Sequence, residues 1–390
     1  MDKTSKINKT ADTEDVSHMR MDRRTIIFSR LKRKLLKHVW LMRGLILFGI
    51  IAFLLTTFLF VLQFFGKTPL GVYMGLAKDF IFTPKGKVES YMDRTNILIL
   101  GKGGEGHEAP DLTDTIMFVS VNHSNSDISI ISLPRDIWIT ELRTKLNSVY
   151  YWGNKKQPPV RRTSGPEEAG GGIIMAKSTV EEFVGQPVHY GLVLDFSGFK
   201  KIIDILEGIE VDVENSFTDE RYPIAGREND LCEGDPEYRC RYETLRFAQG
   251  KQMMDGDTAL KFVRSRNAQG DEGTDIARAR HQQKVIAAIK DKVLSKEIIL
   301  SPRKLLVLKD VVLESIETDI APSAASILAR RFLQSKDVIK SQVLSEELLL
   351  NPAKSPKYDN LYVFIPEDES LDQIHKWIEC VIATEDRCGS

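Results

Sequence analysis

The sequence predicts an α/β protein: a three-layer α/β/α domain with a central mixed sheet, preceded by a single N-terminal transmembrane helix. Short β-branched runs alternate with segments of helical periodicity from residue 95 onward, which is typical of a sheet covered by helices. An uncharged apolar run, residues 44–66, precedes these segments. The part beyond it, about 290 residues once a short connection is set aside, is long enough for one large domain with a single core.

The N-terminal region divides by composition into a basic tail, residues 1–43, and the apolar run, residues 44–66. As a helix the run spans roughly 34 Å, enough for a hydrocarbon core of about 30 Å. The tail has no acidic residue between Arg23 and Arg43. This asymmetry predicts a single-pass protein of the cell membrane, with a cytoplasmic N-terminus and an extracytoplasmic remainder. A cleaved signal peptide is the alternative, but the run starts later and is longer than such signals.

Beyond the membrane, the sequence predicts an extracytoplasmic stalk over residues 67–94 and one domain over residues 95–390. Apolar β-branched runs bounded by turn residues predict strands at 96–101, 115–122, 128–133, 190–194 and 208–213. Apolar residues at helical spacing predict helices at 172–184, 196–206 and 276–293. We interpret residues 259–266 as a strand and residues 297–390 as the end of the same domain.

Arginines near residue 270 have a spacing that predicts an anion site. On a strand at 259–266, Arg264 and Arg266 point to the same side of the sheet. On a helix at 276–293, Arg278 and Gln282 lie one turn apart on the same face. Planar guanidinium groups suit phosphate oxygens, so the pattern indicates a diphosphate site. The alternative is a set of solvated ion pairs with nearby acidic residues, namely Asp271, Glu272 and Asp275.

The formal net charge of only −1 excludes a generally basic nucleic-acid-binding protein, so any bound anion is held locally. A glycine-rich segment, Gly101–Gly106, follows the first predicted strand and resembles a nucleotide-binding loop. It leads into another strand instead of opening a helix, and it lacks the terminal Lys and Ser or Thr of a P-loop. Dinucleotide or nucleoside triphosphate binding is therefore disfavoured.

The four cysteines form two local pairs after the apolar run, Cys232 with Cys240 and Cys380 with Cys388. Closing such short loops with disulfides stabilises a domain by roughly 2 to 3 kcal/mol in the loop-entropy model, and disulfides persist in oxidising compartments. Zinc ligation is the alternative, but the spacing is not Cys-x-x-Cys and no His lies near. Free thiols are the other possibility.

Several short motifs occur in a characteristic order between residues 95 and 290. They are NILILG at 96–101, LTDTIM at 112–117, ISLPRD at 131–136, KLN at 145–147, DFSGF at 195–199 with GIEV at 208–211, GDTALKFVRSR at 256–266, and the Arg278–Gln283 stretch. Together with the preceding signal anchor, they resemble the LytR-CpsA-Psr family of bacterial cell-envelope glycopolymer phosphotransferases.

The resemblance implies a domain that binds a polyprenyl diphosphate-linked glycan, with its lipid in an apolar groove and its diphosphate held by arginines and Mg²⁺ or Mn²⁺. It implies transfer of the glycosyl phosphate, as in teichoic acid or capsule attachment, to an envelope glycan hydroxyl such as peptidoglycan, with release of polyprenyl phosphate. Asp114 is the implied metal ligand. The implied substrate contacts are Arg135, Arg264, Arg266, Arg278 and Gln282.

Two positions depart from the family pattern. The usual Gly-x-Asp-x-Arg after the first strand reads Gly101-Lys-Gly-Gly here, and His281 replaces an arginine. We expect the second catalytic or metal-binding carboxylate to come from Glu105, which is favoured, or from Asp111 or Asp136, with His107 as a possible base. The catalytic set is thus expected to be Asp114, Arg135, Glu105 and Asp136. A non-catalytic lipid-diphosphate binder that regulates envelope assembly, or a pyrophosphatase acting on the same carrier, is the alternative.

Overall fold

The computed structural model describes residues 39–66, 88–104, 109–125, 127–159, 167–227, 229–335, 339–368, 370–383 and 388. The chain separates into two compact units, Met1–Thr68 and Pro69–Ser390. In the first unit, helix α2 (Val39–Gly66) covers the predicted apolar run. A search of the described residues finds no helix that is long and apolar enough to cross a membrane.

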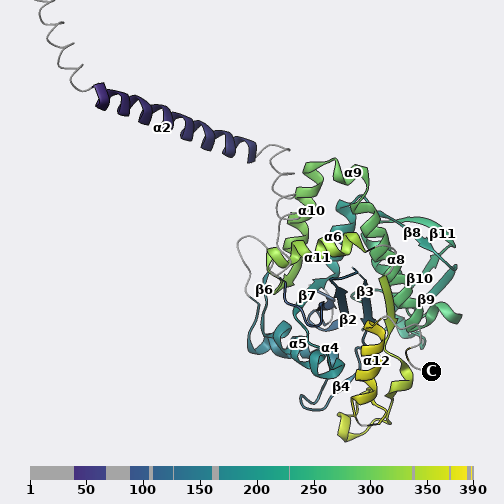
Figure 1. Ribbon diagram of the computed structural model, residues 1–390. Coiled ribbons are helices and arrows are strands. Elements are labelled where there is room, and N and C mark those ends of the chain that lie inside the picture. Colours follow the sequence, from purple (N-terminus) through teal and green to yellow (C-terminus); the bar gives the residue numbers. More distant parts are fainter. Residues whose placement is uncertain are drawn as a thin grey trace, which may run out of the picture. The chain divides into compact units, whose positions relative to one another are not determined.

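The second unit is built on a seven-stranded mixed sheet, with strand order β13-β3-β2-β1-β7-β12-β6 (Figure 1). Its strands are β1 (Arg94–Lys102), β2 (Thr113–Asn122), β3 (Ile128–Ser132), β6 (Glu167–Glu168), β7 (Tyr190–Asp195), β12 (Ile316–Thr318) and β13 (Ile339–Val343). The pairs β1–β7, β3–β13 and β6–β12 are parallel and the others antiparallel. The predicted central mixed sheet is therefore confirmed, and the segment after residue 297 contributes two of its strands.

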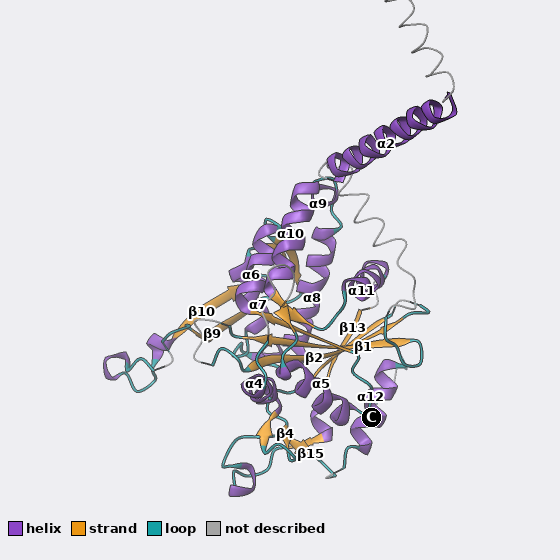
Figure 2. Ribbon diagram, turned by 90° about the vertical axis from the view of Figure 1, so that its left-hand side faces the viewer, coloured by secondary structure: helices purple, strands orange, loops and turns teal. Residues whose placement is uncertain are grey.

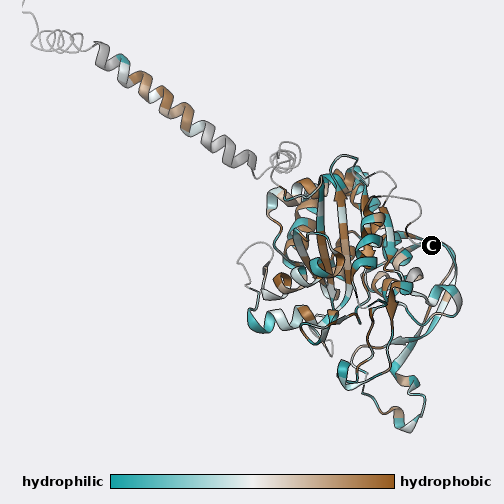
Figure 3. Ribbon diagram, turned by 60° about the horizontal axis from the view of Figure 1, so that its bottom comes forward, coloured by the Kyte–Doolittle hydropathy of each residue, from teal (hydrophilic) through white to brown (hydrophobic). Residues whose placement is uncertain are grey.

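Alternating side chains of the sheet are buried on both faces, which makes the unit three-layered. Leu98 faces a core shared with α4 (Leu146–Lys156), α5 (Gly171–Val184) and α12 (Asp372–Ile382). Ile97 faces the opposite core, with α8 (Asp275–Val293) and α11 (Pro322–Gln334). Figure 2 shows these two groups of helices on either side of the sheet, and Figure 3 shows its apolar strands in brown.

A second hydrophobic core lies beside the sheet and is formed by helices and two strand pairs. The helices are α6 (Phe196–Ile205), α7 (Gly256–Arg264), one face of α8, α9 (Lys296–Ile299) and α10 (Pro302–Ser315). The strands are β8 (Ile209–Val213), β9 (Phe217–Pro223), β10 (Tyr242–Phe247) and β11 (Gly250–Met254). The two pairs are β8–β11 and β9–β10, both antiparallel. Smaller pairs outside this core are β4 (Trp138–Ile139) with β5 (Thr144–Lys145) and β14 (Leu349–Leu350) with β15 (Ile365–Pro366).

The strand interpretation of residues 259–266 is wrong, because this segment ends helix α7. Asp255 caps the helix, and its side chain accepts a hydrogen bond from the Thr258 N–H at 2.8 Å. Ala259, Leu260 and Phe262 are buried, a spacing that suits one face of a helix and not the alternation of a strand. The other predicted strands and helices form close to their expected limits, although β8 pairs outside the central sheet.

Both cysteine pairs are joined as disulfides in the structure. Cys232–Cys240 and Cys380–Cys388 each have a Cα–Cα distance of 5.5 Å, and the structure contains no free cysteine. The first bond closes the segment between β9 and β10, and the second holds residue 388 beside the last turn of α12.

Candidate active site

A cleft of about 380 Å³ lies at one edge of the central sheet, where β1, β3 and β7 end and β2 begins. Ligand sites in α/β proteins commonly lie at the carboxyl ends of parallel strands, where loops from several elements converge. The cleft is lined by Asp114, Thr115, Arg135, Phe196, Asp219, Tyr222, Pro223, Val263, Arg264, Arg266, Asn267, Arg278 and Gln282. The structure thus brings together Asp114, all four predicted arginines and Gln282.

Asp114 and Arg135 form an ion pair at the sheet edge. The Arg135 Nη1 donates to Asp114 Oδ1 at 2.6 Å, and each side chain is about one third exposed, 35% for Asp114 and 34% for Arg135. Burial opposes the charge of Arg135, but contacts with Asp114 and Asp136 together outweigh it and raise the pKa of this guanidinium. Arg135 therefore carries a positive charge at every physiological pH.

Arg264 is held between two aromatic rings at the end of α7. Its guanidinium carbon lies 4.2 Å from the centroid of the Phe196 ring and 5.8 Å from that of Tyr222. Its Nη1 also donates to the Tyr222 hydroxyl at 3.4 Å. Burial raises the pKa of Tyr222 despite the nearby guanidinium, so the phenol remains neutral. Stacking of this kind restricts a long side chain while leaving N–H groups available to an anion.

Helix α8 presents Arg278 and Gln282 to the cleft, one turn apart as predicted. The intervening Arg280 points elsewhere, and its Nη2 lies 3.2 Å from Glu272 Oε1. His281 also contacts this buried carboxylate, with Nε2 2.9 Å from Oε2, and stacks on Phe217. Arg280 thus forms an ion pair with one of the nearby acidic residues, and Arg278 lines the cleft.

Of the candidates for a second carboxylate, the structure describes Asp111 and Asp136. Glu105 and His107 lie outside the described residues. Asp111 accepts from the Lys102 ammonium at 3.2 Å, and Asp136 accepts from Lys145 at 2.7 Å, and neither lines the cleft. Asp136 nevertheless contacts a cleft residue, because its Oδ2 lies 3.5 Å from Arg135 Nε, and its expected catalytic role stays a prediction.

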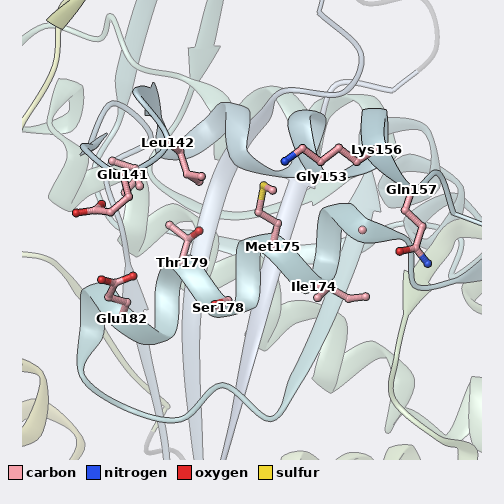
Figure 4. Close-up of a pocket in the computed structure, with 12 residues that line it drawn as sticks. Glu141, Leu142, Gly153, Lys156, Gln157, Ile174, Met175, Ser178, Thr179 and Glu182 are labelled. Atoms are coloured by element: carbon pink, nitrogen blue, oxygen red, sulfur yellow. The ribbon is translucent and has the colours of Figure 1, made fainter.

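A second cavity, of about 400 Å³, lies between α4, α5 and the turn joining β4 to β5. Figure 4 shows Glu141, Lys156 and Glu182 around its rim and Met175 between the two helices. None of the predicted site residues that the structure describes lines this cavity. The cleft at the sheet edge is thus the place where the predicted chemistry gathers.

Comparison with known proteins identifies the relatives of this chain. Residues 78–379 match the LytR_cpsA_psr family. The chain belongs to the LytR-CpsA-Psr family. The polyisoprenyl-teichoic acid–peptidoglycan teichoic acid transferase TagV of Bacillus subtilis is 24% identical over 275 residues, which cover 68% of this chain and 59% of TagV. The same-named transferase TagU of Bacillus anthracis is 23% identical over 311 residues, covering 78% of this chain and 85% of TagU.

Solved structures are also similar to the chain. The crystal structure of B. subtilis TagV matches with a TM-score of 0.49 and 22% identity, covering 76% of this chain and 100% of that one. A structure of TagT bound to LI-WTA matches with a TM-score of 0.48 and 18% identity, covering 76% and 95%.

The cleft of this LytR-CpsA-Psr protein offers few ligand atoms for a metal. Asp114 and Asp219 are the carboxylates at the cleft, but Asp114 already pairs with Arg135, and both oxygens of Asp219 already accept hydrogen bonds. Within the described ranges, the one group of three acidic, His or Cys side chains close enough to share an ion is Asp230 with Cys232 and Cys240, whose sulfurs are bonded to each other. The cleft therefore fits an Mg²⁺ held by one carboxylate and mainly by substrate phosphates, a common arrangement for this ion.

Sequence reasoning missed Phe196, Asp219 and Tyr222, which complete the cleft. The sequence does contain a local pattern at Phe196, because this residue directly follows Asp195, which caps the start of α6. At Asp219 it contains none, since the hydroxyl that this residue binds belongs to a residue 46 positions further along the chain.

Proposed function

We propose that this protein transfers an anionic glycopolymer, as a glycosyl phosphate, from a polyprenyl diphosphate carrier to a hydroxyl of peptidoglycan or a similar envelope glycan. The observation that carries the proposal is the convergence of Arg135, Arg264, Arg266 and Arg278 beside Asp114. Four guanidinium groups in a single cleft provide fixed positive charge and planar donors that complement the negative oxygens of a diphosphate. The names of TagV and TagU support a teichoic acid as the polymer and peptidoglycan as the acceptor.

The reaction is a phosphoryl transfer. The acceptor oxygen forms a bond to the glycan-side phosphorus and loses its proton, and the bond from that phosphorus to the bridging oxygen breaks. Polyprenyl phosphate leaves with the electron pair, so negative charge builds up on the leaving group and on the transferring phosphoryl oxygens. Permanently charged arginines stabilise this charge, and positioning and electrostatics provide most of the catalysis in reactions of this class.

Each residue has a defined part in this scheme. Arg264, stacked on Phe196, binds one side of the diphosphate, and Arg266 and Arg278 bind it from the following segments. Gln282 donates from α8. Asp114, in exchange for its contact with Arg135, would hold Mg²⁺ or Mn²⁺, which supplies additional neutralisation of phosphate charge when bound.

We also propose that α2 anchors the protein in the cell membrane with the domain outside. The support comes from the sequence: residues 44–66 carry no charge, and the preceding segment is basic. A lipid-linked substrate makes such an anchor useful, because carrier and enzyme then share one membrane.

A transfer assay tests the proposal. Full-length protein in detergent is mixed with labelled lipid-linked glycan and peptidoglycan, with and without EDTA. We expect metal-dependent labelling of the peptidoglycan, loss of turnover in Asp114→Ala with carrier binding largely retained, and normal turnover in the exposed control Asp257→Asn. Carrier binding with no transfer to any acceptor would favour the regulatory binder. Release of free glycan phosphate would favour the pyrophosphatase.

A further inference from the structure

Asp219 is a carboxylate in the cleft that has no place in the scheme above. It lies on β9, its accessible surface is 0%, and it lines the cleft beside the arginines. Within the described part of the chain it forms no ion pair with a Lys or Arg side chain. A buried carboxylate is costly unless hydrogen bonds satisfy it, so its partners indicate what it does.

The hydrogen bonds of Asp219 come from the segment that carries the arginines. Its Oδ2 accepts from the Ser265 hydroxyl at 2.7 Å and from the backbone N–H groups of Arg266 and Asn267, each at 3.2 Å. Its Oδ1 accepts from the Arg221 N–H at 3.0 Å. Three donors thus converge on one oxygen, and all three lie between α7 and the next turn.

The position of these donors explains why a carboxylate is needed. Helix α7 ends at Arg264 without a left-handed residue, and Ser265 leaves in an extended conformation with φ −56° and ψ 131°. The following N–H groups therefore have no helical carbonyl to bind, and Asp219 accepts from them instead. An Asn side chain at position 219 could not accept all of these hydrogen bonds, because it has only one accepting oxygen. Its NH₂ group would face N–H or O–H donors on one side or the other.

We propose that Asp219 is a positioning residue that fixes the backbone of residues 265–267 so that Arg266, together with Arg264, faces the substrate diphosphate. This inference rests on the proposed function. Both oxygens of Asp219 accept from N–H and O–H donors, and two of these donors belong to Ser265 and Arg266, so the contact that the structure shows reaches the substrate site through the backbone of Arg266. Arg266→Ala keeps the backbone N–H that Asp219 binds, so the two residues can be separated experimentally.

A double-mutant cycle tests this role. Full-length wild type, Asp219→Asn, Arg266→Ala and the double variant are titrated with farnesyl diphosphate in detergent by calorimetry. We expect each single change to weaken binding about tenfold or more, the typical loss for a charge-assisted contact. The double variant should bind no more weakly than Arg266→Ala alone, because a misplaced backbone has no effect once the guanidinium is gone.

The control is Asp255→Ala, which removes the carboxylate at the opposite end of the same helix, away from the cleft. It should lower stability but leave the affinity for farnesyl diphosphate unchanged, with or without Arg266→Ala. If Asp219→Asn does not fold, Ser265→Ala takes its place in the cycle, since it removes one donor and keeps the carboxylate.

The outcomes separate this inference from the proposed function. If the wild type binds farnesyl diphosphate and the affinity losses of the two single variants multiply in the double variant, the positioning role is overturned and the proposed function stands. Absence of binding by the wild type would overturn both. The positioning role is supported if the affinity losses are non-additive in the cycle of Arg266→Ala with Asp219→Asn or Ser265→Ala, and if Asp255→Ala shows no such effect.

Discussion

Arg264 shows how single residues prepare this cleft for an anion. Contacts with Phe196 and Tyr222 hold its guanidinium in place before any ligand arrives. A long side chain that is already ordered loses less conformational entropy on binding, which favours affinity. The same holds for Arg135, whose guanidinium Asp114 restrains at 2.6 Å.

Arginine replacements test the diphosphate site at the residue scale. Arg264→Ala, Arg266→Ala and Arg278→Ala should each weaken binding of a lipid diphosphate by roughly 1.5 to 3 kcal/mol, or about tenfold to hundredfold, with the fold intact. Calorimetric titration measures the loss.

Arg280→Ala is the matched control for these variants. It lies on the same helix as Arg278 but pairs with Glu272 outside the cleft. It should bind the lipid diphosphate nearly as well as wild type. Equal affinity in all four variants would mean that the arginines form only surface ion pairs.

At the scale of elements, helices α4 and α5 approach each other closely through glycines. A Cβ built on Gly153 would lie 2.3 Å from the Gly171 carbonyl oxygen. Gly153→Ala must therefore push backbone apart and should destabilise the domain by about 1 to 3 kcal/mol. Chemical unfolding measures this, with the α4 surface change Lys155→Ala as the control. An unchanged unfolding midpoint would show that the two helices can separate freely.

Helix α8 depends on a buried histidine for its contact with the second core. Burial lowers the pKa of His281 more than its neighbour Glu272 raises it, so the imidazole is neutral at pH 7. Asn215 and Arg280 contact the same carboxylate. Because the folded pKa is below the unfolded one, the unfolded chain binds more protons at low pH. Stability should be complete above about pH 6.5 and should fall as the pH drops towards the folded pKa.

Unfolding curves at pH 7.5 and pH 5.5 test this dependence. The loss of stability at the lower pH should be smaller in His281→Gln than in wild type, since glutamine does not titrate. His375→Gln, on α12, should retain the wild-type loss. The opposite result, greater stability at pH 5.5 that disappears in His281→Gln, would mean that the Glu272 contact dominates and the histidine is charged.

At the scale of the whole molecule, the disulfides and the membrane topology depend on the same compartment. We expect protease added to intact protoplasts to remove residues 69–390 and leave residues 1–43 protected, because the basic flank keeps the N-terminus inside. Non-reducing peptide mapping should find Cys232 bonded to Cys240 and Cys380 to Cys388. Protection of the domain, or alkylatable thiols in protein from the envelope, would contradict the extracytoplasmic placement.

Local sequence was sufficient for much of this protein. The β-branched runs around Leu98, Phe118 and Ile131 predict the central strands, because each forms from residues adjacent in the chain. Arg278 and Gln282 were predicted to share a helix face for the same reason, since helical spacing depends on neighbours alone. Family motifs then brought Asp114 and Arg135 into the same hypothesis.

Tertiary structure decided how these pieces meet. Residues 259–266 were interpreted as a strand, but the cap at Asp255 and burial of Phe262 against Phe217 and Phe247 make a helix there. Arg264 and Arg266 nevertheless reach one cleft, because Asp219 holds the chain where that helix ends. Contacts between residues 46 positions apart leave no periodicity in the sequence, so only the folded chain reveals them.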